Sequence, residues 1–145
     1  MFQRILIAWD ASRPAQHALD LAVDLARRYD GEIIAVSIAQ SPTHAETRED
    51  REESVQAARE HLQATLGDLR DRADRIGVPL EHVIVNGSHP ADDILRFARE
   101  HAVDLIVVGR HSKGRAGRLL LHGLSERFAQ SAPLPVLIVG ESNGD

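Results

Sequence analysis

The stretch LIVVGRHSKGRAGRLLLHGLSER, from Leu105 to Arg127, joins a continuous aliphatic run to a basic loop with glycines and then to a segment with helical spacing. A continuous run of Val, Ile and Leu is typical of a parallel strand that is covered on both faces. The order of strand, loop and helix in one stretch therefore indicates an α/β fold.

The same pattern recurs along the chain. Further aliphatic runs occupy Ile5 to Trp9, Ile33 to Ala39 and Val136 to Gly140, and a weaker, partly alternating one occupies Glu81 to Gly87. Helical spacing separates these runs, and consecutive parallel strands require such crossovers. We predict an α/β protein with a doubly wound, five-stranded, mostly parallel sheet and helices on both faces, in one domain over residues 1–145.

The predicted helices have apolar residues at intervals of three and four. Ser12 is the expected cap of the first helix. The inward positions, helix by helix, are Ala15, Ala18, Leu19, Ala22 and Ala26; Val55, Ala58, Leu62, Leu66, Leu69, Ala73 and Ile76; Ile94, Leu95, Ala98 and Ala102; Leu124 and Phe128.

Composition limits the function. Apolar residues make up 43% of the 145, and 17 basic against 22 acidic residues give a net charge of -5, which disfavours binding to a nucleic-acid backbone. There are no cysteines, which excludes thiolate chemistry and disulfides. No apolar run approaches roughly 18 residues, so we expect no membrane insertion and a cytoplasmic location.

Ligands of such folds bind beyond the carboxyl ends of the strands, where the winding reverses. Asp10, Gly87 and Gly109 end three of the predicted strands, and the basic loop follows Gly109. The loop could hold an anion, but it matches neither the P-loop nor the dinucleotide fingerprint. Two plainer interpretations stay open: an exposed basic loop, and an Asp10 that only caps a helix.

Metal binding and catalysis have little support. The eight histidines include no pair four residues apart, and only His111 and His122 fall near the expected cleft. There is no G-x-S-x-G motif, so we predict no catalytic residues.

Three stretches together resemble the universal stress protein family: ILIAWDASRPAQHALDLA, HAVDLIVVGRHSKGR and LSERFAQSAPLPVLIVG. The resemblance covers the whole chain and implies the adenine nucleotide alpha hydrolase-like fold. One departure is Ala11, which stands where the family has Gly after the aspartate. Trp9 is another unusual residue, and we expect its side chain to cover a sheet face.

Family members that bind ATP resemble G-x-x-G-x9-G-[ST] after the fourth strand. Counted from Gly109 without gaps, the later positions are Ser112, His122 and Gly123, so only the first glycine matches. The adenosine end is better preserved. By resemblance, the nucleotide-binding residues are Ala8, Asp10, Ile38, Gly87, Gly109, Arg110, His111, Ser112, His122, Gly123, Leu124 and Ser125.

The resemblance implies a stress-response or regulatory module that binds an adenine nucleotide, ATP with Mg²⁺ being the candidate cofactor. Two alternatives remain: a stress protein that binds no nucleotide and acts through protein partners, and a weak ATP hydrolase. Because the last run, Val136 to Gly140, would lie at a sheet edge, we also expect a two-fold homodimer in which these strands meet antiparallel.

Overall fold

A computed structural model describes residues 1–40, 52, 53, 56, 57, 60, 66–110 and 123–140. In chain order its elements are β1 (Arg4–Ala8), α1 (Arg13–Tyr29), β2 (Glu32–Gln40), α3 (Leu66–Ile76), β3 (Leu80–Gly87), α4 (Pro90–Glu100), β4 (Leu105–Gly109), α5 (Leu124–Ser131) and β5 (Val136–Val139). The predicted strands are confirmed to within one residue at each end.

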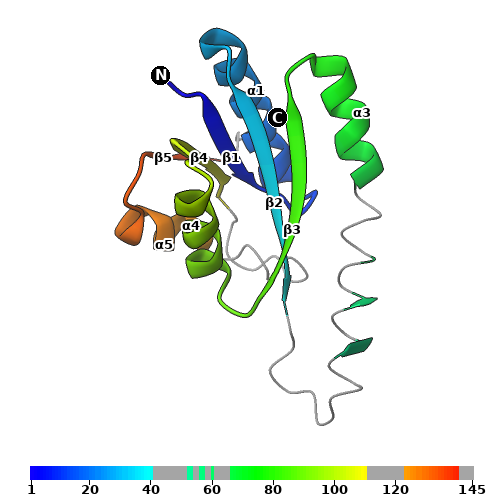
Figure 1. Ribbon diagram of the computed structural model, residues 1–145, viewed down its shortest axis with the longest axis vertical. Coiled ribbons are helices and arrows are strands. Elements are labelled where there is room, and N and C mark those ends of the chain that lie inside the picture. The colour runs from blue at the N-terminus through cyan, green and yellow to red at the C-terminus, as the bar shows by residue number, and fades with distance from the viewer. Residues whose placement is uncertain (41–51, 54–55, 58–59, 61–65, 111–122, 141–145) are drawn as a thin grey trace.

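The strands form one sheet in the order β3-β2-β1-β4-β5 (Figure 1). Every pairing is parallel, so the sheet is fully parallel where the sequence predicted a mostly parallel one. The order places β1 at the centre, with β2 and β3 on one side and β4 and β5 on the other. The predicted doubly wound fold is thereby confirmed.

Helices cover both faces of the sheet, and each face has its own apolar cluster. Alternate residues of β1 separate between the clusters, because successive side chains of a strand point to opposite faces. Ile5, Ile7 and Trp9 pack with α1 and α3, whereas Leu6 and Ala8 pack with α4 and α5. Figure 1 shows α4 and α5 together, apart from α1 and α3.

The helix patterns are confirmed for α1 and α5. All five inward residues predicted for α1 are buried, as are Leu124 and Phe128 of α5. In the second predicted helix, Leu69 is buried and Ala73 and Ile76 are half-buried, while Val55, Ala58 and Leu62 lie outside the described residues. Ala102 was assigned wrongly, because α4 ends at Glu100 and Ala102 is an exposed residue with φ 55°. Trp9 is fully buried against α1, which confirms that it covers a sheet face.

Candidate functional site

The winding of the sheet reverses between β1 and β4. β1 pairs with β2 on one side and with β4 on the other, where Ile7 lies beside Val107. The crossovers to β2 and β3 therefore lead to one side of β1, and those to β4 and β5 lead to the other. In open α/β sheets, the crevice beyond the carboxyl ends of two such strands is the usual ligand site. Asp10 follows one of these strands and Arg110 follows the other.

Asp10 is buried and holds the start of α1. Its Oδ1 accepts a hydrogen bond from the Ser12 N–H at 2.9 Å, and Ser12 Oγ in turn accepts from the Ala15 N–H at 3.3 Å. Ser12 is thus confirmed as the N-cap. The helix-capping interpretation of Asp10 is correct for Oδ1, which holds the turn from β1 into α1.

Ala11, between these two residues, has φ 63°. This is the left-handed region, which side chains with a Cβ adopt at a cost of about 1 kcal/mol or more. The turn from β1 into α1 therefore requires the conformation that glycine adopts freely. That requirement explains why Gly is the family's residue at this position, and it makes Ala11 a strained residue next to Asp10.

Gly109 is explained by packing. A Cβ at Gly109 would overlap the backbone carbonyl of Pro14 and approach its side chain to 2.7 Å. The end of β4 therefore contacts the first turn of α1 so closely that only glycine fits. Because this contact alone requires the residue, the one glycine that matches the phosphate motif is not evidence for phosphate binding.

Three of the predicted site residues lie in one apolar cluster. Ala8, Ile38 and Leu124 come from β1, β2 and α5, and their exposures are only 1%, 1% and 3%. They form a floor of core side chains beneath the carboxyl ends of the strands. The cluster also brings the first residue of α5 to the same face as the end of β1.

The helix α5 begins without a side-chain cap. Gly123 is the N-cap, with φ 77°, and makes no side-chain capping bond. The first N–H groups of a helix have no intrahelical partner and carry a partial positive charge, which favours anions. Ser125, in this first turn, is buried, and its Oγ lies 3.5 Å from Glu126 Oε2.

Gly87 lies elsewhere. It ends β3 and pairs with Gln40, so it is separated from β1 by the whole of β2. A Cβ at Gly87 would overlap the carboxylate of Asp93. That buried carboxylate accepts from the His89 N–H at 3.2 Å and from Arg96 at 2.7 Å. Gly87 therefore accommodates a cap of α4 and does not border the crevice between β1 and β4.

Of the remaining predicted residues, Arg110 is exposed, and its backbone N–H donates to Val139 O at 2.9 Å. His111, Ser112 and His122 lie outside the described residues. The predicted phosphate loop is thus described only at its two ends, Arg110 and Gly123.

Sequence reasoning missed one polar network beside the crevice. Ser37 is fully buried on β2, and its hydroxyl donates to Trp9 O at 2.6 Å. Its Oγ also lies 2.9 Å from Nε2 of His82, on β3. Burial, and then the charge of Arg70, lower the pKa of His82 below 6.5. A serine inside the apolar run IIAVSIA was the available signal, because a buried hydroxyl needs a partner.

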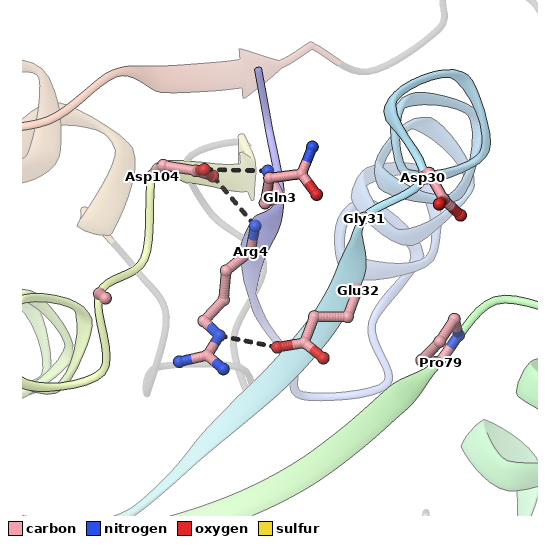
Figure 2. Close-up of a pocket in the computed structure, with 8 residues that line it drawn as sticks. Gln3, Arg4, Asp30, Gly31, Glu32, Pro79 and Asp104 are labelled. Atoms are coloured by element: carbon pink, nitrogen blue, oxygen red, sulfur yellow. Dashed lines mark hydrogen bonds and ion pairs between the residues drawn. The ribbon is translucent and has the colours of Figure 1, made fainter.

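A further cavity is at the opposite end of the sheet. It has a volume of about 540 Å³ and lies among Gln3, Arg4, Asp30, Gly31, Glu32, Pro79, Ala102 and Asp104. Figure 2 shows how three of its charged side chains are held: Asp104 accepts from the backbone N–H groups of Gln3 and Arg4 at 2.9 and 3.2 Å, and Arg4 Nε donates to Glu32 at 2.7 Å.

The described residues contain no group of three His, Cys, Asp or Glu side chains that could hold a metal ion. Within the same residues, no helix is long and apolar enough to cross a membrane.

The fold and the crevice define a parallel α/β protein whose candidate ligand site lies at a topological switch point. The model of the universal stress protein family matches residues 1–140, and the chain belongs to this family. Universal stress protein MJ0531 of Methanocaldococcus jannaschii is 30% identical over 141 residues, which cover 96% of this chain and 82% of the relative.

Solved structures agree with this assignment. A universal stress protein family member from Burkholderia pseudomallei is 30% identical with a TM-score of 0.78, and the match covers 95% of this chain and 96% of the other. A universal stress protein in complex with cAMP is 26% identical with a TM-score of 0.71, over 97% of this chain and 98% of the other. The predicted family and fold are both confirmed.

Proposed function

We propose that this universal stress protein is a regulatory module that binds an adenine nucleotide in the crevice between β1 and β4. The observation that carries the proposal is the placement of α5. Its first residue, Leu124, packs in the same apolar cluster as Ala8, and the first N–H groups of a helix favour anions, which supports a phosphate at this end of the sheet. The complex of a relative with cAMP supports the ligand class.

In this proposal each described group has one task. Ala8 and Ile38 provide an apolar floor for the adenine, and Asp10 accepts hydrogen bonds from ribose hydroxyls. The N–H groups of the first turn of α5 receive a phosphate. Arg110, His111, Ser112 and His122 border the phosphate end by resemblance to the family, and Mg²⁺ would accompany ATP. We assign no catalytic residue.

Isothermal titration calorimetry at pH 7.5 with cAMP, AMP, Mg-ADP and Mg-ATP tests the proposal. We expect binding of at least one of these nucleotides, weakened about tenfold in Asp10→Asn, which keeps the acceptor for the Ser12 N–H but loses the charge. Asp104→Asn, at the other end of the sheet, is the matched control and should bind like wild type. No heat for any nucleotide would overturn the proposal and favour a protein that acts only through partners.

The phosphate end is tested by His122→Gly alone. If the imidazole occupies the space of the terminal phosphates, this variant binds Mg-ATP more tightly while its affinity for AMP is unchanged. Gly123→Ser is unsuitable as a companion, because φ 77° at this position strains any side chain. Release of inorganic phosphate from Mg-ATP by the wild type is measured in the same samples, and turnover would favour the weak hydrolase.

We further propose that the protein is a homodimer joined by antiparallel β5 strands. β5 is the last strand on its side of the described sheet, and Ile138 on it is 38% exposed. Such edges favour pairing with another chain. Light scattering should give twice the mass of the chain, and Ile138→Lys should give the monomer. The cytoplasmic location remains a prediction.

A further inference from the structure

A chain of hydrogen bonds runs from β3 through β2 to the last peptide before Asp10. The Ser37 hydroxyl has one proton, and a carbonyl can only accept, so that proton goes to Trp9 O. Ser37 Oγ is then the acceptor for His82, whose Nε2 must carry the hydrogen. The contacts thus assign the Nε2–H form of the imidazole. His82 donates to Ser37, and Ser37 donates to the Trp9 carbonyl.

The network fixes the peptide that joins Trp9 to Asp10. A peptide is planar, and the chain has no cis bonds among the described residues, so the Trp9 C=O and the Asp10 N–H point in opposite directions. Since Ser37 on β2 holds the carbonyl, the Asp10 N–H points away from Ser37. The orientation of this one peptide therefore sets where Asp10 begins relative to the crevice.

The strand ladder alone does not provide this restraint. β1 ends at Ala8, and the Trp9 N–H still donates to Val36 O at 2.9 Å. The next group along the chain, the Trp9 carbonyl, is held by a side chain. A side-chain hydroxyl can rotate, and the His82 contact on its other side limits that rotation. His82 therefore restrains a peptide two strands away without contacting it.

We propose that Ser37 and His82 are positioning residues of the nucleotide site, which hold the Trp9–Asp10 peptide in the conformation that presents Asp10 to the ligand. This inference rests on the proposed nucleotide binding. Neither residue contacts the ligand itself. Ser37 acts through the Trp9 carbonyl, and His82 acts through Ser37.

Calorimetry with cAMP tests this role. The charge of its phosphodiester does not change near neutral pH, so ionisation of the ligand does not contribute to differences in affinity. Ser37→Ala should weaken binding about tenfold, and His82→Leu by a smaller factor of about three, since Ser37 still contacts Trp9 O. Ser37→Thr and His82→Gln restore a hydroxyl and an Nε2 donor, and should return the affinity to within about twofold of wild type.

A matched variant separates positioning from general stability. Val83→Ala, on the opposite face of β3, removes apolar packing without touching the network. Unfolding in urea gives the stability of each variant, and binding is compared at a temperature where all are folded. We expect Val83→Ala to bind like wild type even if it is as unstable as Ser37→Ala. Equal affinities for Ser37→Ala and wild type would overturn the positioning role alone.

A spectroscopic measurement gives a second readout. In ¹⁵N–¹H spectra, Ser37→Ala should shift the Asp10 amide signal, whereas Val83→Ala should leave it in place. The ¹⁵N shifts of His82 should report a protonated Nε2 and a bare Nδ1 at pH 7.5. The opposite tautomer, or an unmoved Asp10 signal, overturns the inference. If wild type binds no nucleotide, the proposed function and this role fail together.

Discussion

The two ends of the sheet differ in how their polar groups are used. At the amino end, Arg4, Glu32 and Asp104 are paired with one another and with backbone groups around the cavity of about 540 Å³. Helices α1 and α4 both end here, and helix C-termini favour cations. Arg4 already supplies the cation, and its Nη1 donates to His101 O at 2.6 Å.

At the carboxyl end of the sheet, polar side chains accept hydrogen bonds at the N-termini of helices. Asp10 and Ser12 cap α1, the Asp93 carboxylate accepts at the start of α4, and α5 begins at Gly123 without a side-chain cap. Helix N-termini favour anions. The two ends therefore differ in chemistry: at the amino end Arg4 and Glu32 pair with each other, while at the carboxyl end α5 begins with N–H groups that favour an anion.

The largest loss of stability is expected from Gly109→Ala, at the carboxyl end of the sheet. The added Cβ collides with Pro14 of α1, so we expect the free energy of unfolding to fall by about 3 kcal/mol. Urea unfolding measures the loss. Gly140→Ala is the control, because no described residue lies within 4 Å of that Cβ and its effect should be small. Equal effects in the two variants would contradict the packing explanation.

At the amino end, Asp104→Ala removes the acceptor of the Gln3 and Arg4 N–H groups. We expect a loss of about 1–2 kcal/mol in unfolding free energy, since two backbone donors lose their partner. Nucleotide affinity should not change. Weaker nucleotide binding by the folded variant would mean that the two ends are coupled, and would remove the distinction drawn here.

A smaller effect of opposite sign is expected at Ala11. Ala11→Gly relieves the left-handed strain at φ 63°, and the gain exceeds the entropy lost by glycine, so unfolding free energy should rise by about 0.5 kcal/mol. Thermal unfolding with a van't Hoff analysis measures it. Asp30, also left-handed with φ 54° but at the amino end, provides the matched change Asp30→Gly. A loss of stability in Ala11→Gly would contradict the assigned strain.

The smallest effect concerns pH and His82. Its pKa is below 6.5 in the folded protein because of burial and Arg70, so on acidification the unfolded chain takes up the proton first. Above pH 6.5 the lowered pKa of His82 therefore does not reduce the free energy of unfolding. As the pH falls below that value, it reduces the free energy of unfolding. From about pH 7.5 to about pH 5.5, wild type should lose more unfolding free energy than His82→Gln. Equal losses of unfolding free energy in wild type and His82→Gln would contradict the lowered pKa of His82.

Much of the fold follows from sequence pattern alone. The run LIVVG at Leu105–Gly109 coincides with β4, because a buried parallel strand needs apolar residues on both faces. The α1 helix was predictable from its cap and spacing. The position of Ala102 outside α4 was not predictable. Ala102 continues the apolar spacing of that helix, and the spacing does not show that the helix ends at Glu100.

The site was less predictable, because its residues depend on register and on close approach. Gly109 and Gly87 both follow strands, and sequence cannot distinguish a glycine that borders a ligand from one that admits Pro14 or Asp93. The partnership of Ser37 and His82 depends on the register of β2 and β3, in which Ala35 pairs with His82. A sequence pattern can identify the buried serine but not the histidine that reaches it.

Trp9 is the only tryptophan of the chain, and it is fully buried directly before Asp10. Its indole N–H has no hydrogen-bond partner among the described residues. An indole in such dry surroundings fluoresces at short wavelength, and water shifts that emission to the red. The protein therefore contains its own optical probe directly before Asp10, and one emission spectrum can follow unfolding without a label.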